Sequence, residues 1–183
     1  MVSFENALPA APPTRTRRLF FALWPSSALA EEIDCLSAKL DAGPHARRID
    51  PAALHITLAF LGAVIDSRVA ELTELAASLP SPKLHFQLDR IGCFRRSGIV
   101  WAGSHEPDPA LSQFVAALNA GLKGLGYAIE AREFVPHVTV FRRGLVRGTH
   151  PIDPPLVWHS EGFRLVESIP GAGYKPLWRN DAG

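Results

Sequence analysis

Apolar and polar side chains alternate with a period of two along residues 54–60 (LHITLAF). Neighbouring side chains of a β-strand point to opposite faces of the sheet, so this alternation predicts a strand with aliphatic residues on one face. His55 and Thr57 then share the other face. The pattern therefore predicts a half-buried strand that carries polar side chains on its second face.

Residues 134–141 (FVPHVTVF) alternate in the same way, and His137 and Thr139 again share one face of the expected strand. Both segments fit the pattern x-His-aliphatic-Thr-aliphatic, and almost half the chain separates them. A glycine follows each histidine within seven residues, Gly62 in the first copy and Gly144 in the second. We interpret the repeat as an ancient duplication in which two lobes each contribute one motif strand.

Apolar spacing and turn residues predict the other elements. Compact apolar runs predict strands at 19–24, 84–90, 98–103 and 163–168, followed by a short end segment at 174–178. Apolar residues at helical spacing predict three helices, which begin near residues 26, 66 and 108 and end near residues 43, 80 and 125.

Composition restricts the class of protein. Of the 183 residues, 47% are hydrophobic and 20% are charged, and no apolar run approaches the ~20 residues that cross a bilayer. Residues 1–16 hold three prolines without periodicity, which predicts a flexible tail before one folded domain at residues 17–183. The apolar run near the start of that domain is too short for a secretory signal. We therefore expect a soluble, cytoplasmic monomer without a membrane span.

Charge and cysteine content exclude further classes. Nineteen basic and eighteen acidic residues give a net charge of +1, which argues against binding long nucleic acid by bulk electrostatics. Cys35 and Cys93 lie in different expected elements without metal-ligand spacing, so we expect buried free thiols rather than a disulfide or a zinc site. An anionic ligand must therefore be held locally.

The paired histidines suit the opening of a cyclic phosphate ester. Adding water to a 2′,3′-cyclic phosphate needs a base for the nucleophile and an acid for the departing ribose oxygen, and imidazoles with pKa about 6.5 can serve as both. A threonine two residues along the strand, on the order of 6.5 Å away, can donate its hydroxyl to a phosphate oxygen. No carboxylate cage accompanies either motif, so we expect no metal ion, and Arg142 is the candidate for neutralising the transition state.

With these flanks, the chain resembles the RNA 2′,3′-cyclic phosphodiesterases, historically called bacterial 2′-5′ RNA ligases, of the two-histidine phosphoesterase superfamily. The resemblance runs from about Arg18 to Trp178. It rests on four segments, RLFFALWP at 18–25, LHITLAFLG at 54–62, PHVTVFRR at 136–143 and LVES at 165–168.

The resemblance implies an α+β fold of two lobes, in which two antiparallel sheets face a central cleft and the helices lie outside. It also implies hydrolysis of a cyclic phosphate to a 2′-phosphate without a cofactor, and weak reverse joining of RNA ends through a 2′-5′ linkage. By matching positions, His55 would protonate the departing 3′ oxygen and His137 would activate water. The phosphate would be held by Thr57, Thr139 and Arg142.

Other polar and aromatic residues are expected to be structural. These are the histidines His45, His85, His105, His150 and His159, the core aromatics Phe20, Phe21 and Phe60, the solvated pairs Arg47-Arg48 and Arg95-Arg96, and the cleft-side partner Glu167.

Three other functions fit the same residues. The chemistry could serve 2′-5′ linked oligonucleotides or small cyclic nucleotides, which rates on mononucleotides and oligonucleotides would separate. If the protein were a non-catalytic module that binds RNA ends, replacing His55 by Ala would leave RNA turnover unchanged. A metal-dependent hydrolase would lose activity to a chelator and regain it with metal.

Overall fold

The computed structural model describes residues 15–80, 83–106, 108–130, 133–160 and 162–180. Within these ranges the strands are β1 (Thr16–Leu23), β2 (Arg47–Arg48), β3 (Ile56–Ile65), β4 (His85–Phe94), β5 (Ile99–Gly103), β6 (His137–Arg142), β7 (His150–His159), β8 (Arg164–Ile169) and β9 (Gly173–Arg179). The helices are α1 (Ser27–Ala38), α2 (Val69–Ser78) and α3 (Pro109–Gly124), with short 3-10 helices η1 (Pro51–Ala53) and η2 (Asp66–Arg68).

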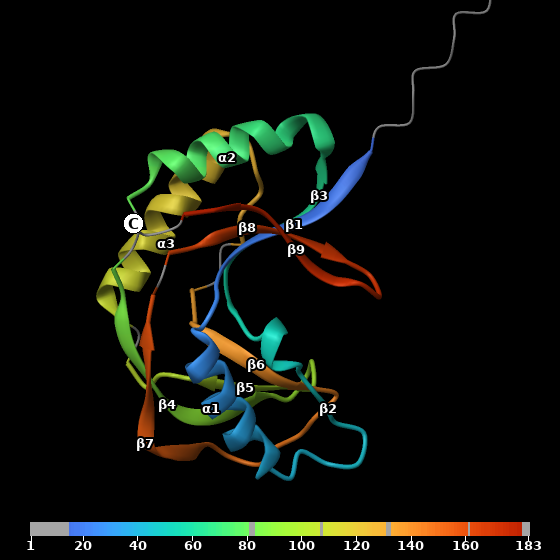
Figure 1. Ribbon diagram of the computed structural model, residues 1–183, viewed down its shortest axis with the longest axis vertical. Coiled ribbons are helices and arrows are strands. Elements are labelled where there is room, and N and C mark those ends of the chain that lie inside the picture. The colour runs from blue at the N-terminus through green and yellow to red at the C-terminus, as the bar shows by residue number, and fades with distance from the viewer. Residues whose placement is uncertain (1–14, 81–82, 107, 131–132, 161, 181–183) are drawn as a thin grey trace, which may run out of the picture.

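The strands pair antiparallel in the order β7-β4-β5-β6-β3-β1-β8-β9, and β2 pairs with β6. In the middle of this order a single residue pair, Ile56 with Val138, joins β3 to β6. The ladders on either side of this seam are longer. The α+β fold is therefore confirmed, and the two expected sheets are the halves of one hydrogen-bonded sheet (Figure 1).

The two halves follow the same path. In one half the chain runs from β1 through α1 to the motif strand β3, and in the other from β5 through α3 to the motif strand β6. Each helix packs on the opposite half, because α1 contacts β6 and β7 while α3 contacts β3. Figure 1 shows α1 over the lower half and α2 with α3 against the upper half. The exchanged helices tie the halves together.

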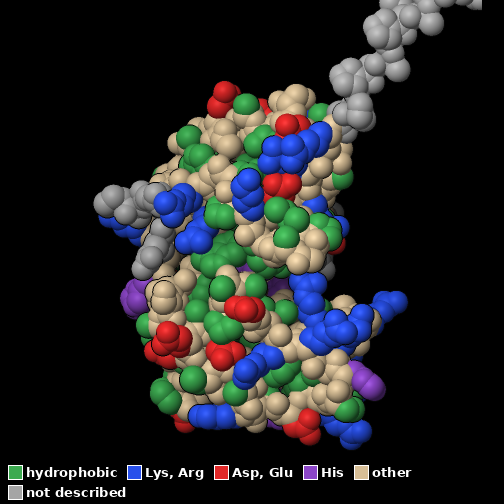
Figure 2. All heavy atoms as spheres, turned by 45° about the vertical axis from the view of Figure 1, so that its right-hand side comes forward, with side chains coloured by type: hydrophobic (Ala, Val, Ile, Leu, Met, Phe, Trp, Pro, Cys, Tyr) green, Lys and Arg blue, Asp and Glu red, His purple; other side chains and the backbone are tan. Residues whose placement is uncertain are grey.

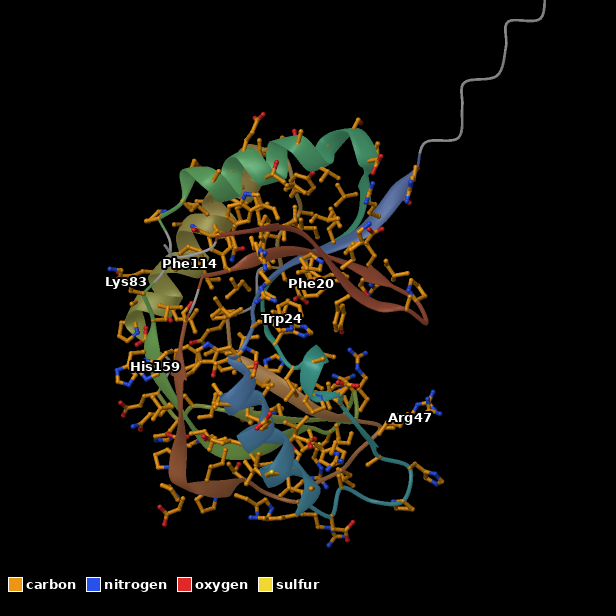
Figure 3. All side chains as sticks on the ribbon, viewed as in Figure 1. Phe20, Trp24, Arg47, Lys83, Phe114 and His159 are labelled. Carbon is orange, nitrogen blue, oxygen red and sulfur yellow. The ribbon has the colours of Figure 1, made fainter. Side chains whose placement is uncertain are left out.

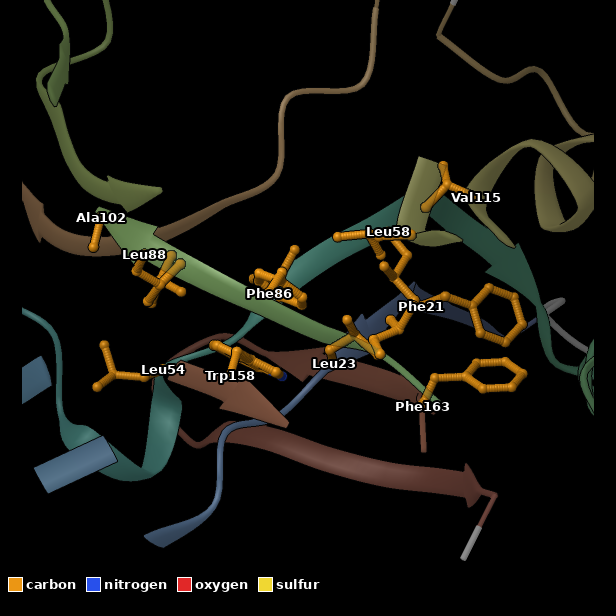
Figure 4. Close-up of a cluster of buried hydrophobic side chains, with 14 of the residues drawn as sticks. Phe21, Leu23, Leu54, Leu58, Phe86, Leu88, Ala102, Val115, Trp158 and Phe163 are labelled. Atoms are coloured by element: carbon orange, nitrogen blue, oxygen red, sulfur yellow. The ribbon is translucent and has the colours of Figure 1, made fainter. Parts of the chain in front are cut away.

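One hydrophobic core runs through both halves. Figure 4 shows Leu23 of β1 close to Phe86 of β4 and Trp158 of β7, with Phe21 of β1 beside Phe163. All of these side chains are buried, and full burial of each large apolar side chain stabilises the fold by about 1.5–3 kcal/mol. The core therefore fixes the position of both motif strands.

The starts of α1 and α3 follow the capping rules, whereas α2 follows Arg68 without a side-chain cap. Ser26 Oγ accepts a hydrogen bond from the Leu29 N–H at 3.3 Å, and Asp108 Oδ1 accepts one from the Leu111 N–H at 2.7 Å. Pro109 opens α3, where its missing N–H costs nothing. The apolar residues whose spacing predicts this helix are buried, namely Leu111, Phe114, Val115, Leu118 and Leu122.

Three features of the secondary structure differ from the sequence-based expectations: one strand, one helix end and the start of the domain. The strand β7 is an element that the sequence analysis did not predict, and it contains prolines at the sheet edge, where proline is tolerated. The first helix ends at Ala38, well before Gly43. Of the predicted tail, residues 1–14 lie outside the described residues, while Thr16 pairs with Ile65 at the start of β1.

Two expectations about burial are wrong. Cys35 is exposed on α1, and Cys93 is half-buried with its thiol 3.8 Å from the Gly144 carbonyl oxygen. Phe60 is 48% exposed, because Leu58 forms a bulge against β1 that reverses the inward and outward alternation of β3. No helix among the described residues has the length and apolar character needed to cross a membrane.

Candidate active site

The two motif strands meet at the seam between the halves. Ile56 and Val138 are partners across this seam and are completely buried. Side chains one residue before or after them in each strand therefore point to the opposite face. That face carries the four motif residues His55, Thr57, His137 and Thr139, all of which are partly exposed.

The register of the seam sets each histidine against the threonine of the other copy. With Ile56 opposite Val138, one step along the antiparallel strands places Thr57 opposite His137 and Thr139 opposite His55. Directly opposed residues have Cβ atoms about 4.5–5.5 Å apart. The structure thus brings together all four motif residues that the sequence predicted as site residues.

Both imidazoles are held by a hydrogen bond to the backbone carbonyl two residues earlier. The Nδ1 atom of His55 lies 2.7 Å from the carbonyl oxygen of Ala53, and that of His137 lies 2.8 Å from the carbonyl oxygen of Val135. A carbonyl oxygen only accepts hydrogen bonds, so Nδ1 is the donor in each ring. This tautomer makes Nε2 the nitrogen that exchanges a proton with a ligand.

Three aromatic rings, from Phe20, Trp24 and Tyr174, surround the His55 imidazole, and we call them the aromatic enclosure. The Trp24 ring stacks on it at 4.9 Å, the Phe20 ring lies at 5.1 Å, and the Tyr174 ring meets it edge-on at 5.0 Å. Figure 3 labels Phe20 and Trp24, which lie between the two halves. The sequence analysis assigned Phe20 to the core and did not single out Trp24 or Tyr174.

Burial lowers the pKa of His55 from its usual value of 6.5 to about 4. The hydrogen bond to the Ala53 carbonyl opposes this shift, and the positive charges of Arg142 and His137 add to it. His55 is therefore neutral at neutral pH in the unliganded protein. The influence of Arg142 on this pKa also links its guanidinium electrostatically to the site.

His137 has more open surroundings. Its ring meets Phe94 edge-on at 5.0 Å, and a cavity of about 530 Å³ begins beside it and Thr57. Phe60 and Phe134 contribute to the walls of this cavity. Figure 2 shows a hollow between the two halves, with histidine side chains deep inside it and hydrophobic side chains around them.

Arg142 closes the second motif strand and is exposed. Two strands flank it, because Arg47 of β2 and Ile99 of β5 are both register partners of Arg142. The sequence analysis treated Arg47 only as a solvated residue, and the pairing instead sets a second guanidinium beside the candidate phosphate ligand. Only the long-range pairing of β2 reveals this neighbour.

The other polar candidates lie apart from the motif residues. His85 and His159 are exposed cross-strand partners whose rings stack at 4.6 Å, and His150 Nε2 lies 2.9 Å from the Arg147 carbonyl oxygen. Glu167 accepts a hydrogen bond from Arg17 at 3.1 Å, which confirms its role as a structural partner. Among the described residues, no group of three or more His, Cys, Asp or Glu side chains is placed to hold a metal ion.

Comparison with known proteins gives one consistent family. A family model described as the 2′-5′ RNA ligase superfamily matches residues 25–150. The chain is 32% identical over 126 residues to the RNA 2′,3′-cyclic phosphodiesterase of Escherichia coli strain K12, covering 69% of this chain and 72% of that protein. It is 27% identical over 155 residues to that of Archaeoglobus fulgidus, covering 82% and 85%.

Solved structures agree with the sequence relatives. The crystal structure of Escherichia coli LigT complexed with 3′-AMP is similar to this fold with a TM-score of 0.81 at 31% identity, covering 91% of this chain and 98% of that one. The family model spans both motif histidines, and the resemblance inferred from the residues is confirmed. The chain therefore belongs to the 2′-5′ RNA ligase superfamily.

Proposed function

We propose that this protein hydrolyses the 2′,3′-cyclic phosphate of an RNA end or a ribonucleotide to a 2′-phosphate, without a metal ion. The observation that carries the proposal is the pair of imidazoles on one face of the seam, both fixed with Nδ1 as the donor. Relatives named RNA 2′,3′-cyclic phosphodiesterase support the same reaction.

In the proposed reaction His137 is the base and His55 is the acid. Nε2 of His137 takes a proton from water, and the water oxygen attacks phosphorus. The bond from phosphorus to the 3′ oxygen breaks, and Nε2 of His55 donates a proton to that oxygen. The products are a 2′-phosphate and a 3′-hydroxyl, and the proton gained by His137 returns to His55 through solvent before the next turnover.

Three side chains stabilise the charge that develops on the phosphate. The hydroxyls of Thr57 and Thr139 donate to its non-bridging oxygens from opposite strands. The guanidinium of Arg142 offers a planar pair of donors to the same oxygens at the exposed end of β6. Together they supply the neutralisation that a metal ion supplies in other phosphoesterases.

The acid must carry a proton when the substrate is bound. His55 is neutral in the unliganded protein because its pKa is about 4. An anionic phosphodiester beside its imidazole favours the charged form and raises the pKa. We therefore propose that His55 takes up its proton as the substrate binds.

The same groups support the reverse reaction. When a 5′-hydroxyl of a second RNA end replaces water, the attack opens the cyclic phosphate and forms a 2′-5′ linkage. His137 again takes the proton of the nucleophile and His55 again protonates the 3′ oxygen. Water is the far more abundant nucleophile, so hydrolysis dominates.

An assay on an RNA with a 2′,3′-cyclic phosphate end, run with a chelator, tests the proposal. We expect complete conversion to a 2′-phosphate end by the wild-type protein and a rate about 10³-fold lower for the His55→Ala variant. A 3′-phosphate product would contradict the proposed departure of the 3′ oxygen. Turnover that stops with the chelator and resumes with added metal would contradict the metal-independent mechanism.

A further inference from the structure

The cavity beside His137 is large enough for a nucleoside. Its volume is about 530 Å³, whereas the cavity beside the aromatic enclosure, lined in part by Trp24 and Tyr174, has about 120 Å³. Small-molecule sites usually have about 300–1,000 Å³. Thr57 and His137 lie at the border of the large cavity. Of these two cavities, only the one on the His137 side has room for the base of a nucleotide whose phosphate lies at the seam.

Aromatic side chains in this cavity are unusually exposed. Phe60 is 48% exposed and Phe94 is 38% exposed, and both contribute to the lining together with Phe134. Exposed large apolar groups gathered in a hollow are typical of a binding surface. A planar base can stack on such rings, and stacking accepts every base because each has a π-face.

Away from Thr57 and His137, the polar side chains that line the cavity include hydrogen-bond acceptors. Asn119 Oδ1 is buried and has no hydrogen-bond partner among the described residues, although a buried polar atom without a partner costs about 1–3 kcal/mol. Glu133 also lines the cavity and is exposed. No lysine or arginine is among the described lining residues. The acceptors in this part of the lining suit a ligand that donates hydrogen bonds.

We propose that this cavity is the subsite for the base of the nucleotide that carries the cyclic phosphate, and that it favours guanine. The proposal rests on the proposed hydrolysis of cyclic phosphates. Guanine presents its N1–H and N2 amino group side by side, which matches the two oxygens of a carboxylate such as Glu133. Adenine and cytosine present only an amino group, and uracil presents one N–H between two carbonyls that face the acceptors.

The specificity of the wild-type protein tests the proposal first. We measure kcat/KM for the 2′,3′-cyclic phosphates of guanosine, adenosine, cytidine and uridine with a chelator present. We expect guanosine to exceed uridine by about tenfold or more, since a bidentate contact gives discrimination of that size. Equal values for the four nucleotides, or a preference for uridine, would overturn the proposal. If none of the four is hydrolysed, the proposed function itself fails.

Variants then assign the preference to this cavity. Glu133→Gln and Asn119→Leu should each reduce the ratio of guanosine to uridine kcat/KM several-fold. Phe60→Ala should raise KM for all four nucleotides while kcat changes little, because the ring stacks on any base. Glu74→Gln, an exposed glutamate on α2, is the matched control and should keep the wild-type ratio. A ratio that stays at the wild-type value in both Glu133→Gln and Asn119→Leu would refute the subsite.

Discussion

His55 and His137 occupy matching positions in two copies of one motif, and their surroundings differ. In each copy Nδ1 lies within hydrogen-bonding distance of the carbonyl oxygen two residues earlier. Around His55 three rings of the aromatic enclosure cover much of the imidazole, whereas His137 has one ring beside it and borders a large cavity. The duplicated motif supplies two equivalent imidazoles, and elements outside the motif make them different.

This difference has a chemical use. A base that activates water must be reached by water, and the open side of the site provides that access at His137. The enclosed imidazole of His55 gains a proton only when an anion lies beside it, because burial holds its pKa at about 4. His137 is thus placed to activate water, and His55 is placed to gain its proton when the anionic substrate binds.

Outside the two histidines, the largest effect is expected at Arg142, which stabilises charge on the phosphate from the rim. Arg142→Ala should lower kcat/KM for a 2′,3′-cyclic nucleotide by about 10²–10³-fold, the usual loss when one charge-stabilising donor is removed. Arg142→Lys should recover part of the loss through its charge. The neighbouring Arg143→Ala is the control, and an equal loss in that variant would show that Arg142 contributes only to the general charge of the rim.

A smaller effect is expected in the pH dependence of stability. His55 binds a proton in the unfolded chain below pH 6.5 but in the folded protein only below about pH 4. Its contribution is therefore complete above pH 6.5 and is lost as the pH falls from 6.5 to about 4. Between pH 7 and pH 5 the wild-type protein should lose about 2 kcal/mol more free energy of unfolding than His55→Gln.

Urea unfolding at the two pH values measures this difference directly. The same experiment on His137→Gln gives the comparison between the two histidines. If the wild-type protein and His55→Gln lost the same free energy of unfolding between pH 7 and pH 5, the enclosure would not keep His55 neutral.

The smallest effect is expected from opening the aromatic enclosure. Trp24→Ala admits water to one face of the imidazole and should raise the pKa of His55 by about 1 pH unit, since desolvation is the main cause of its low value. A titration of the His55 ring protons by NMR measures the change. Phe94→Leu alters the surroundings of His137 instead and should leave the His55 pKa in place. A similar shift in both variants would break the distinction between the two environments.

Local patterns predicted the motif strands because alternation with a period of two is a property of each strand alone. It placed His55 with Thr57 and His137 with Thr139 before any pairing was known. The same rule failed at Phe60, because a bulge depends on the partner strand and leaves no mark in the alternation itself.

The surroundings of the histidines could not be predicted in this way. Trp24 reaches His55 from the end of β1, and Tyr174 reaches it from β9, far along the chain. Long-range pairing of the strands decides which rings meet, and the sequence shows these only as aromatic residues in separate segments. The cavity beside His137 likewise depends on long-range contacts, because it is lined by β3 together with residues 128–130 and 133–135.

The central claim is that the two histidines act as one catalytic unit, and kcat for the His55→Ala, His137→Ala and double variants tests it most directly. With a chelator present, each single variant should lose about 10³-fold or more in hydrolysis of a 2′,3′-cyclic nucleotide. The double variant should fall at most about tenfold further, because residues that act as a unit are not additive. The account would be contradicted if the loss in kcat of the double variant equalled the product of the two single losses. A single variant that keeps most of its activity would also contradict it.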